Sequence, residues 1–187
     1  MDGQRFTLRF AGRTPLVMNS NSGLLEGGVD KGRDKAQWER DHFLDLVYKS
    51  PSGQLCIPAR AIKKMLIVAC RFVADKPKGT SFKSFGPLVE AALIIEDDAL
   101  LDTPIENVIP WTVVVNLDPS KGPKGPRGAR TRPLIPVPWA AQTMAIAFDA
   151  LLTKDVLQKI AVAAGWKCGL LDARAIDMGR CDIEVTV

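Results

Sequence analysis

The sequence predicts an α+β fold, because strand-like and helix-like segments alternate along one chain of 187 residues. In residues 5–10 and again in residues 181–187, apolar and polar side chains alternate with the period of two that is typical of a half-buried strand. Between these strands, residues 59–73 carry apolar side chains at the 3.6-residue spacing of an amphipathic helix. The length is sufficient for one domain with a real core.

Pro58 is expected to open the best-defined helix, since a helix N-terminus does not need the N–H that proline lacks. One face of this helix is apolar, and Lys63 and Lys64 belong to its basic opposite face. The apolar run 88–95 predicts a buried strand.

A further strand and a second helix are predicted between residues 142 and 165. Residues 142–148 have a strand pattern. Thr153 is a suitable N-cap for the helix that follows, and Gly165 is the expected stop signal. A further helix with a ragged apolar stripe is expected at 34–48.

Two insertions, at about 11–57 and 96–140, interrupt this series. The remaining segments, about 1–10, 58–95 and 141–187, read strand, helix, strand, strand, helix, strand. This is the order of a ferredoxin-like βαββαβ core, which RNA-recognition domains share. We therefore predict a single domain with a ferredoxin-like core.

In that topology the first and last strands are neighbours, so Arg5 and Arg9 should share a face with Asp182 and Glu184. Each opposite-charge pair would contribute about 0.2 to 1 kcal/mol. This face lacks the aromatic residues with which RNA-recognition sheets stack bases. Any nucleic acid should therefore contact the insertions and helix ends.

The most basic stretch of the chain is 119–132, which has no acidic residue in a chain of net charge +4. Its cations are Lys121, Lys124, Arg127, Arg130 and Arg132. Its glycines and prolines predict a mobile loop, and strand-like flanks at 108–117 and 132–139 make it the tip of a β-hairpin. Five phosphate contacts on a single strand would give log affinity against log salt a slope of about −3.5. A solvated linker is the alternative.

Composition is that of an ordinary globular protein, with 47% hydrophobic and 25% charged residues. No apolar run approaches the roughly 18 residues of a membrane span, and the N-terminus lacks the apolar segment of a signal peptide, so we expect a cytoplasmic protein that does not contact membranes. The four cysteines are far apart, which predicts reduced thiols and no zinc site.

Several motifs together resemble one family. The N-terminal ones are GLLEGGVDK and GQLCIPARAIKKMLIVACR, and the C-terminal ones are RTRPLIPVPW, AAGWKCGLLDAR and GRCDIEV. In this order they are similar to the RAMP proteins of CRISPR systems, in particular their backbone subunits, and to stand-alone phage or prophage relatives. The turn Gly169–Arg174 has one glycine where the family has two, and Cys181 stands where an aromatic residue is usual.

The resemblance implies a ferredoxin-like palm, a β-thumb that contains the basic loop, and self-association along single-stranded nucleic acid, with RNA favoured over DNA. Other CRISPR or phage subunits are further expected partners. Phosphate contacts would come from Lys63 and Lys64, from the five cations of the basic loop, and from Arg174 and Arg180. Trp111 and Trp139 flank the basic loop and would either stack on bases or close a small core.

Two residues suggest chemistry. His42 is the only histidine, and some RAMP relatives process CRISPR RNA with a histidine, so an endoribonuclease is the competing enzyme hypothesis. Asp30 resembles an aspartate with which some backbone subunits cleave RNA with a divalent metal. No cofactor is expected unless Asp30 is catalytic, in which case Mg²⁺ would be needed. Conventional hydrolase and nucleotide-binding motifs are absent from the sequence.

A third hypothesis is a structural or inhibitor protein of phage origin, in which the basic loop contacts another protein. It predicts a protein free of nucleic acid after purification. The favoured hypothesis is a non-catalytic subunit that binds single-stranded nucleic acid and oligomerises on it.

Overall fold

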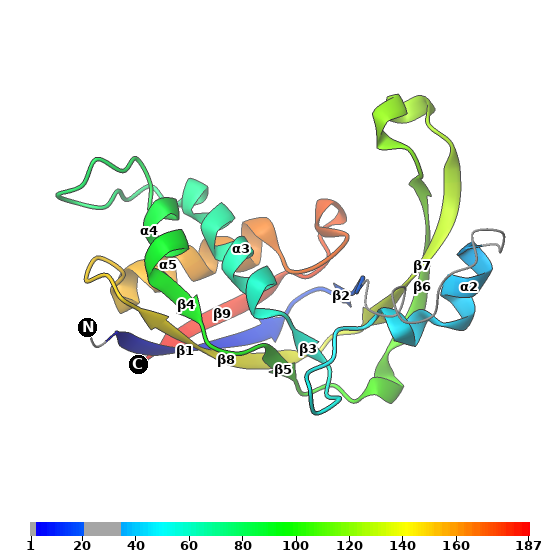
Figure 1. Ribbon diagram of the computed structural model, residues 1–187, viewed down its shortest axis with the longest axis horizontal. Helices are drawn as coiled ribbons and strands as arrows, with labels where there is room; N and C mark the ends of the chain where they lie inside the picture. The colour runs from blue at the N-terminus through cyan, green and yellow to red at the C-terminus, as the bar shows by residue number, and fades with distance from the viewer. Residues whose placement is uncertain (1–2, 21–34) are drawn as a thin grey trace.

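A computed structural model of the chain describes residues 3–20 and 35–187, and it contains two antiparallel sheets (Figure 1). The larger sheet has the order β3–β5–β8–β1–β9, and β4 also pairs with β8. Its strands are β1 (Gln4–Gly12), β3 (Cys56–Ile57), β4 (Leu93–Ile95), β5 (Ala99–Leu101), β8 (Ala140–Ala147) and β9 (Cys181–Thr186). The smaller sheet has the order β2–β7–β6, with β2 (Leu16–Val17), β6 (Ile109–Asn116) and β7 (Arg127–Ile135).

β1 and β9 are antiparallel neighbours at one edge of the larger sheet, as the predicted order of strands and helices required. Arg9 lies opposite Glu184, in agreement with the expected charge pairing across these strands. The register places Asp182 opposite Ala11, so Arg5 shares the face of these acids but has none of them directly across from it. Arg5 instead lies 3.8 Å from Glu96, and Asp182 accepts a hydrogen bond from Arg13 at 2.6 Å.

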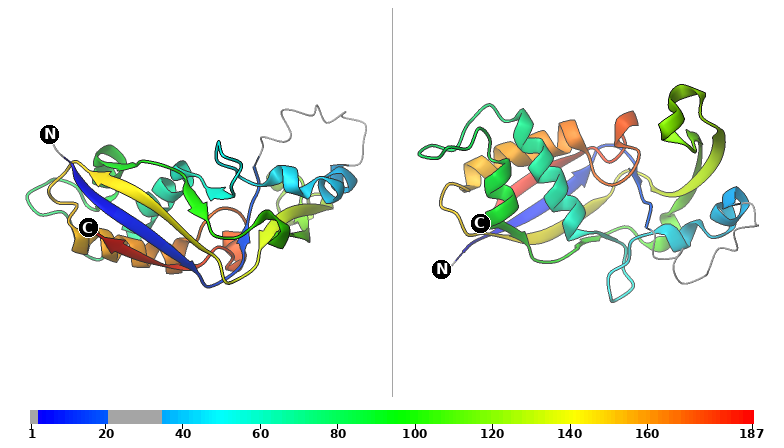
Figure 2. Two further views of the ribbon diagram at one scale, coloured as in Figure 1. Left: turned by 90° about the horizontal axis from the view of Figure 1, so that it is seen from below. Right: turned by 45° about the horizontal axis from the view of Figure 1, so that its top comes forward.

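Helices α3 (Ala59–Ala69), α4 (Gly86–Ala92) and α5 (Lys154–Ala163) lie on one face of the larger sheet (Figure 2). Among the residues that the structure describes, no helix covers the other face. Between the helices and the sheet lies the core, into which α3 buries Ile62, Met65, Leu66 and Ala69. Thr153 is the N-cap of α5 as expected, and its side chain accepts a hydrogen bond from the Val156 N–H.

α5 does not stop at Gly165. The chain continues through one π-helical turn, η5 (Ala164–Cys168), and Gly169 then takes a left-handed conformation with φ of 70°. Gly165 has a packing role, because a Cβ at this position would lie 2.0 Å from the carbonyl oxygen of Cys181. The glycine therefore allows the close approach of this turn to β9.

The strand predicted at 88–95 is wrong in its first part. Residues up to Ala92 form α4, and only Leu93–Ile95 pair with β8. Pro87 stands in the first turn of α4, and the helix buries its Leu88 and Val89 side chains in the core. In a short run of apolar residues, the hydrophobic periodicity does not distinguish a buried strand from a buried helix.

β6 and β7 pair in register from Ile109 opposite Leu134 to Asn116 opposite Arg127. The paired strands project from the end of the molecule that lies away from both termini and bend toward the helix-covered side (Figures 1 and 2). A short turn, η4 (Pro119–Lys124), closes the tip. The basic stretch is therefore a loop only in its first part, because β7 begins at Arg127.

The helix expected at 34–48 is shorter than predicted. α2 (Lys35–Asp41) is followed by a 3-10 turn, η1 (Phe43–Leu46). Three further 3-10 turns are η2 (Cys70–Phe72), η3 (Ile105–Asn107) and η6 (Arg174–Ile176). Most of the predicted glycine-rich loop before α2 lies outside the described residues.

The four cysteines are unpaired, and Cys56, Cys70 and Cys181 are buried. Burial is the main cause that raises the pKa of the Cys56 thiol to about 12. Within residues 3–20 and 35–187, no helix combines the length and the apolarity needed to cross a membrane.

Candidate nucleic-acid interface

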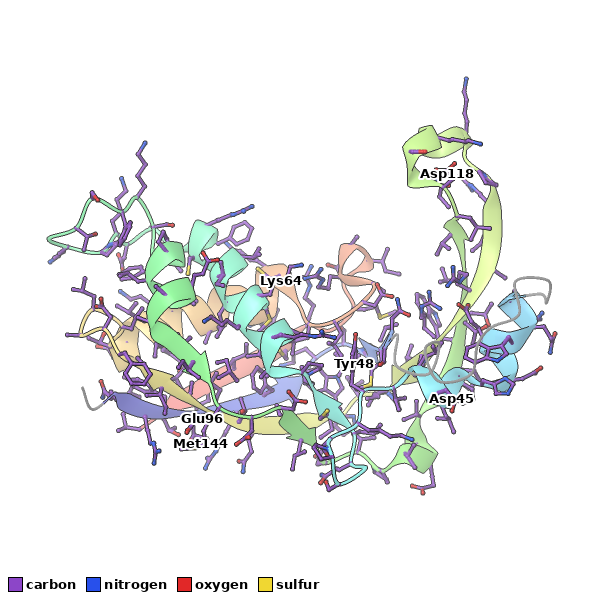
Figure 3. All side chains as sticks on the ribbon, viewed as in Figure 1. Asp45, Tyr48, Lys64, Glu96, Asp118 and Met144 are labelled. Atoms are coloured by element: carbon purple, nitrogen blue, oxygen red, sulfur yellow. The ribbon has the colours of Figure 1, made fainter. Side chains whose placement is uncertain are left out.

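The hairpin tip exposes three cations, Lys121, Lys124 and Arg127. The Asn116 side chain stabilises this turn by donating a hydrogen bond to the Gly122 carbonyl at 2.5 Å. Lys121 lies 3.6 Å from Asp118, the residue labelled at the tip in Figure 3. An exposed pair of this kind contributes little to stability, so all three cations are available to a ligand.

The base of the hairpin contains a buried ion-pair network. The Glu39 side chain of α2 is 1% exposed, and it accepts hydrogen bonds from Nε of Arg130 at 2.8 and 2.9 Å and from the Thr131 N–H at 3.1 Å. Nη1 of Arg132 lies 3.0 Å from the same carboxylate. The two arginine side chains are only 20% and 11% exposed. Unlike the tip cations, both arginines are therefore already paired.

The Glu39 carboxylate is ionised in this setting. Burial raises its pKa, but the hydrogen bonds from Arg130 and Arg132 and the charge of Arg132 outweigh burial and lower the pKa below its ordinary value. The ion pairs connect α2 to β7 and so fix the position of the base of the hairpin.

A second basic group lies between α3 and the segment after α5. Lys64 and Arg174 line a cavity of about 250 Å³ together with Tyr48 and Asp172. The Tyr48 hydroxyl donates to the Asn19 carbonyl at 3.0 Å, which fixes one wall, and Figure 3 shows Lys64 and Tyr48 on neighbouring elements. Lys63 is half-buried and does not line this cavity.

The segment after η5 has an unusual backbone. Leu171, Ala173 and Asp177 take left-handed conformations with φ between 57° and 62°. Such conformations cost about 1 to 3 kcal/mol each for residues other than glycine, and they cluster at functional sites. The turn therefore holds left-handed conformations at Leu171 and Ala173, neither of which is glycine.

Arg180 closes this second group. Its Nη2 donates to Asp177 at 3.0 Å and to the Arg174 carbonyl at 3.4 Å. Its Nη1 is buried without a hydrogen-bond partner among the residues that the structure describes. A buried guanidinium nitrogen with an unused donor is unusual, and an anion could satisfy it.

The pKa of the Cys168 thiol responds to several basic side chains that lie near it. Burial raises the pKa of its thiol, and the charges of Arg180, Arg174 and Arg71 partly oppose that rise. Because these charges act on one sulfur atom, the three arginines surround the same short segment. Arg71 was not predicted as a site residue, since the sequence gives no sign that the end of α3 lies near residue 168.

The two candidate stacking tryptophans differ. Trp139 is buried, its Nε1 donates to the Thr14 carbonyl at 2.9 Å, and its ring packs on Gly12. It closes the core, and its predicted role in base stacking is wrong. Trp111 is half-buried on β6 opposite Arg132, and its role stays a prediction.

The two candidate catalytic residues are not brought together. His42 is exposed, its ring stacks on Trp38 with centroids 4.9 Å apart, and its Nδ1 lies 3.1 Å from the Trp38 carbonyl. Asp30 lies outside the described residues. Within the described ranges, no group of three or more histidine, cysteine or acidic side chains is arranged to hold a metal ion.

The helix-free face of the larger sheet has the opposite character. A cavity of about 560 Å³ on this face is lined by Leu100 and Met144 and by the carboxylates of Asp97, Asp98 and Asp102. Figure 3 shows Met144 beside Glu96 on this side. Arg9 also lines this cavity, but three carboxylates outnumber its one positive charge, so the net charge of the lining disfavours phosphate.

No protein-family model matches the sequence, and no curated protein is similar to it. Among solved structures, a chain of the Type III-B Cmr-beta complex bound to cognate target RNA superposes with a TM-score of 0.60 at 12% identity, over 97% of this chain. The present chain spans 60% of that longer chain. The chain has the fold of RAMP-type CRISPR proteins.

Two further RAMP-type structures are similar, each at 12% identity over 98% of this chain. Cmr6 from Pyrococcus furiosus has a TM-score of 0.48, with 98% of its own chain covered. A chain of a Type IV-B CRISPR complex has a TM-score of 0.47, with 91% covered. The Cmr-beta chain, with its TM-score of 0.60, confirms at the level of the fold the resemblance to RAMP proteins that the sequence motifs predicted.

Proposed function

We propose that this chain is a non-catalytic RNA-binding subunit of a CRISPR-type ribonucleoprotein. The order β4–β8–β1–β9, with α3 and α5 in the two crossovers, supports a ferredoxin-like palm. The projecting β6–β7 hairpin supports a thumb. The RNA bound to the Cmr-beta complex makes RNA the first ligand to test.

The observation that carries the proposal is the separation of charge between the two sides of the molecule. The hairpin tip bends toward the helix-covered side, where Lys64 lies on α3 (Figures 1 and 3). Carboxylates collect on the helix-free side. A phosphate backbone that follows the basic side would meet cations at both ends of its path.

We further propose that several copies assemble along one RNA strand, with other CRISPR subunits as additional partners. The projecting hairpin supports this proposal. Among the described residues of its tip, none belongs to the hydrophobic core, so the packing of this chain does not by itself account for so long a hairpin. A neighbouring copy and the RNA between the copies would bury it.

Salt-dependent RNA binding tests the proposed function. Only three cations of the basic stretch are free, so we expect the hairpin to contribute about −2.1 to the slope of log affinity against log salt, at roughly 0.7 per phosphate. Changing Lys121, Lys124 and Arg127 together to alanine should make the measured slope shallower by this amount. Fluorescence anisotropy with a labelled single-stranded RNA measures it.

A matched control replaces three exposed cations away from the hairpin, Arg5, Arg9 and Lys154, with alanine. The net charge change is the same, but the slope should stay near that of the unmodified protein. Equal slopes for the tip variant and the unmodified protein would contradict the assignment of the hairpin to RNA.

A further inference from the structure

A groove of about 510 Å³ between the end of α3 and the last turns of α5 is lined by exposed apolar side chains. In this groove Phe72 is 48% exposed and Trp166 is 59% exposed, and Val162 of α5 also lines it. Most aromatic side chains of this size are buried when they serve only the core. Two of them open to solvent in one groove therefore suggest a ligand with a flat apolar face.

Two cations, Lys159 and Lys167, line the groove together with the aromatic rings. Nζ of Lys167 lies 5.3 Å from the centre of the Phe72 ring, within the range of a cation–π contact. Lys159 also lines the groove, and its Nζ is 2.5 Å from Asp75, the one acidic residue of the lining. The charges of Lys159 and Asp75 cancel in the sum over the groove, and Lys167 adds one positive charge that no other acid of the lining offsets.

The groove adjoins the candidate interface. Arg71 directly precedes Phe72, and its charge acts on Cys168 together with the charges of Arg174 and Arg180. Trp166 and Lys167 directly precede Cys168 in η5. The aromatic groove therefore lies next to the arginines of the second basic group. The loop that follows Phe72 adds exposed Lys76, Lys78 and Lys83 beyond the groove.

We propose that this groove is a base-stacking site for single-stranded RNA, in which a base stacks on Trp166 and the flanking phosphates contact Arg71 and Lys167. The proposal rests on the proposed function and extends it from phosphate binding to contact with bases. Stacking on an aromatic ring tolerates every base, so the site binds RNA without sequence preference. The positive charge of Lys167 and Arg71 favours a ligand that joins flat apolar groups to negative charges, as the bases and phosphates of RNA do.

Two labelled oligomers of equal length and charge separate base contacts from phosphate contacts. One is oligouridylate, and the other is an abasic ribose-phosphate strand. Trp166→Ala should weaken binding of oligouridylate by about 5- to 160-fold, the effect of about 1 to 3 kcal/mol for one stacked base. It should leave binding of the abasic strand unchanged. Trp166→Phe keeps an aromatic ring and should retain most of the affinity.

Phe148→Ala is the matched control, because Phe148 is 44% exposed but packs beside Gly3 and does not line the groove. It should leave both affinities unchanged. Unchanged oligouridylate binding by Trp166→Ala, when the unmodified protein binds RNA, would overturn the stacking site, leave the proposed function intact and point to a protein ligand. Equal weakening for both oligomers would also overturn it. Failure of the unmodified protein to bind either oligomer would overturn both proposals.

Discussion

Glu39 is the residue on which the position of the hairpin depends most. Its buried carboxylate receives hydrogen bonds from Arg130 and the Thr131 N–H and an ion pair from Arg132. The sequence could not predict this network, because Glu39 is separated from Arg130 by 91 positions. The sequence of the basic stretch alone suggests five equivalent cations. In the structure, Arg130 and Arg132 lie on the same side of β7 and pair with Glu39, so they differ from the three exposed cations at the tip.

Replacing Glu39 with glutamine should lower the free energy of unfolding by about 3 kcal/mol near neutral pH, since two guanidinium groups then lose their buried counter-charge. Urea denaturation measures this difference. Glu90→Gln, on the exposed side of α4, is the control and should change stability by less than about 0.5 kcal/mol. Equal stability of Glu39→Gln and the unmodified protein would contradict the role given to this network.

The same network predicts a pH dependence. The pKa of Glu39 is lower in the folded protein than in the unfolded chain, where it is about 4.3. Its contribution is therefore fully present above about pH 4.3 and is lost as the pH falls through the folded pKa. The stability difference between the unmodified protein and Glu39→Gln should shrink in acid, and repeating the urea titrations at about pH 3 tests this. A difference that grows in acid would contradict the lowered pKa.

At the scale of elements, strong periodicity was the reliable signal. β1, β9 and α3 are where the alternation and the helical spacing predicted them. α4 was missed because the run at 88–95 has no clear period, and a helix and a strand share it. The aromatic groove was missed because Phe72 and Trp166 meet only after α3 and α5 pack. A tryptophan followed by lysine just past Gly165 is the one local hint.

The β6–β7 hairpin should be separable from the rest of the molecule. Replacing residues 116–127 with Asn-Gly joins the strands through a two-residue turn and removes the three exposed cations. We expect an unchanged melting temperature, because the removed residues do not belong to the core cluster, together with weaker RNA binding. Differential scanning calorimetry and anisotropy measure the two effects. A large loss of stability would show that the tip supports the fold.

At the scale of the whole molecule, we propose opposite roles for the two sides of one sheet. The helix-covered side, with the hairpin tip, Lys64 and Arg174, would face RNA, whereas carboxylates prevail in the cavity on the helix-free side. The fold is similar to that of one chain of the Cmr-beta complex, at 12% identity and a TM-score of 0.60.

The most direct test of the central claim is the mass of the protein by size-exclusion chromatography with light scattering, with defined single-stranded RNAs of increasing length. We predict a nucleic-acid-bound particle whose protein mass rises with RNA length and which falls apart on nuclease treatment in high salt. A monomer whose mass is unchanged by every RNA would contradict the account.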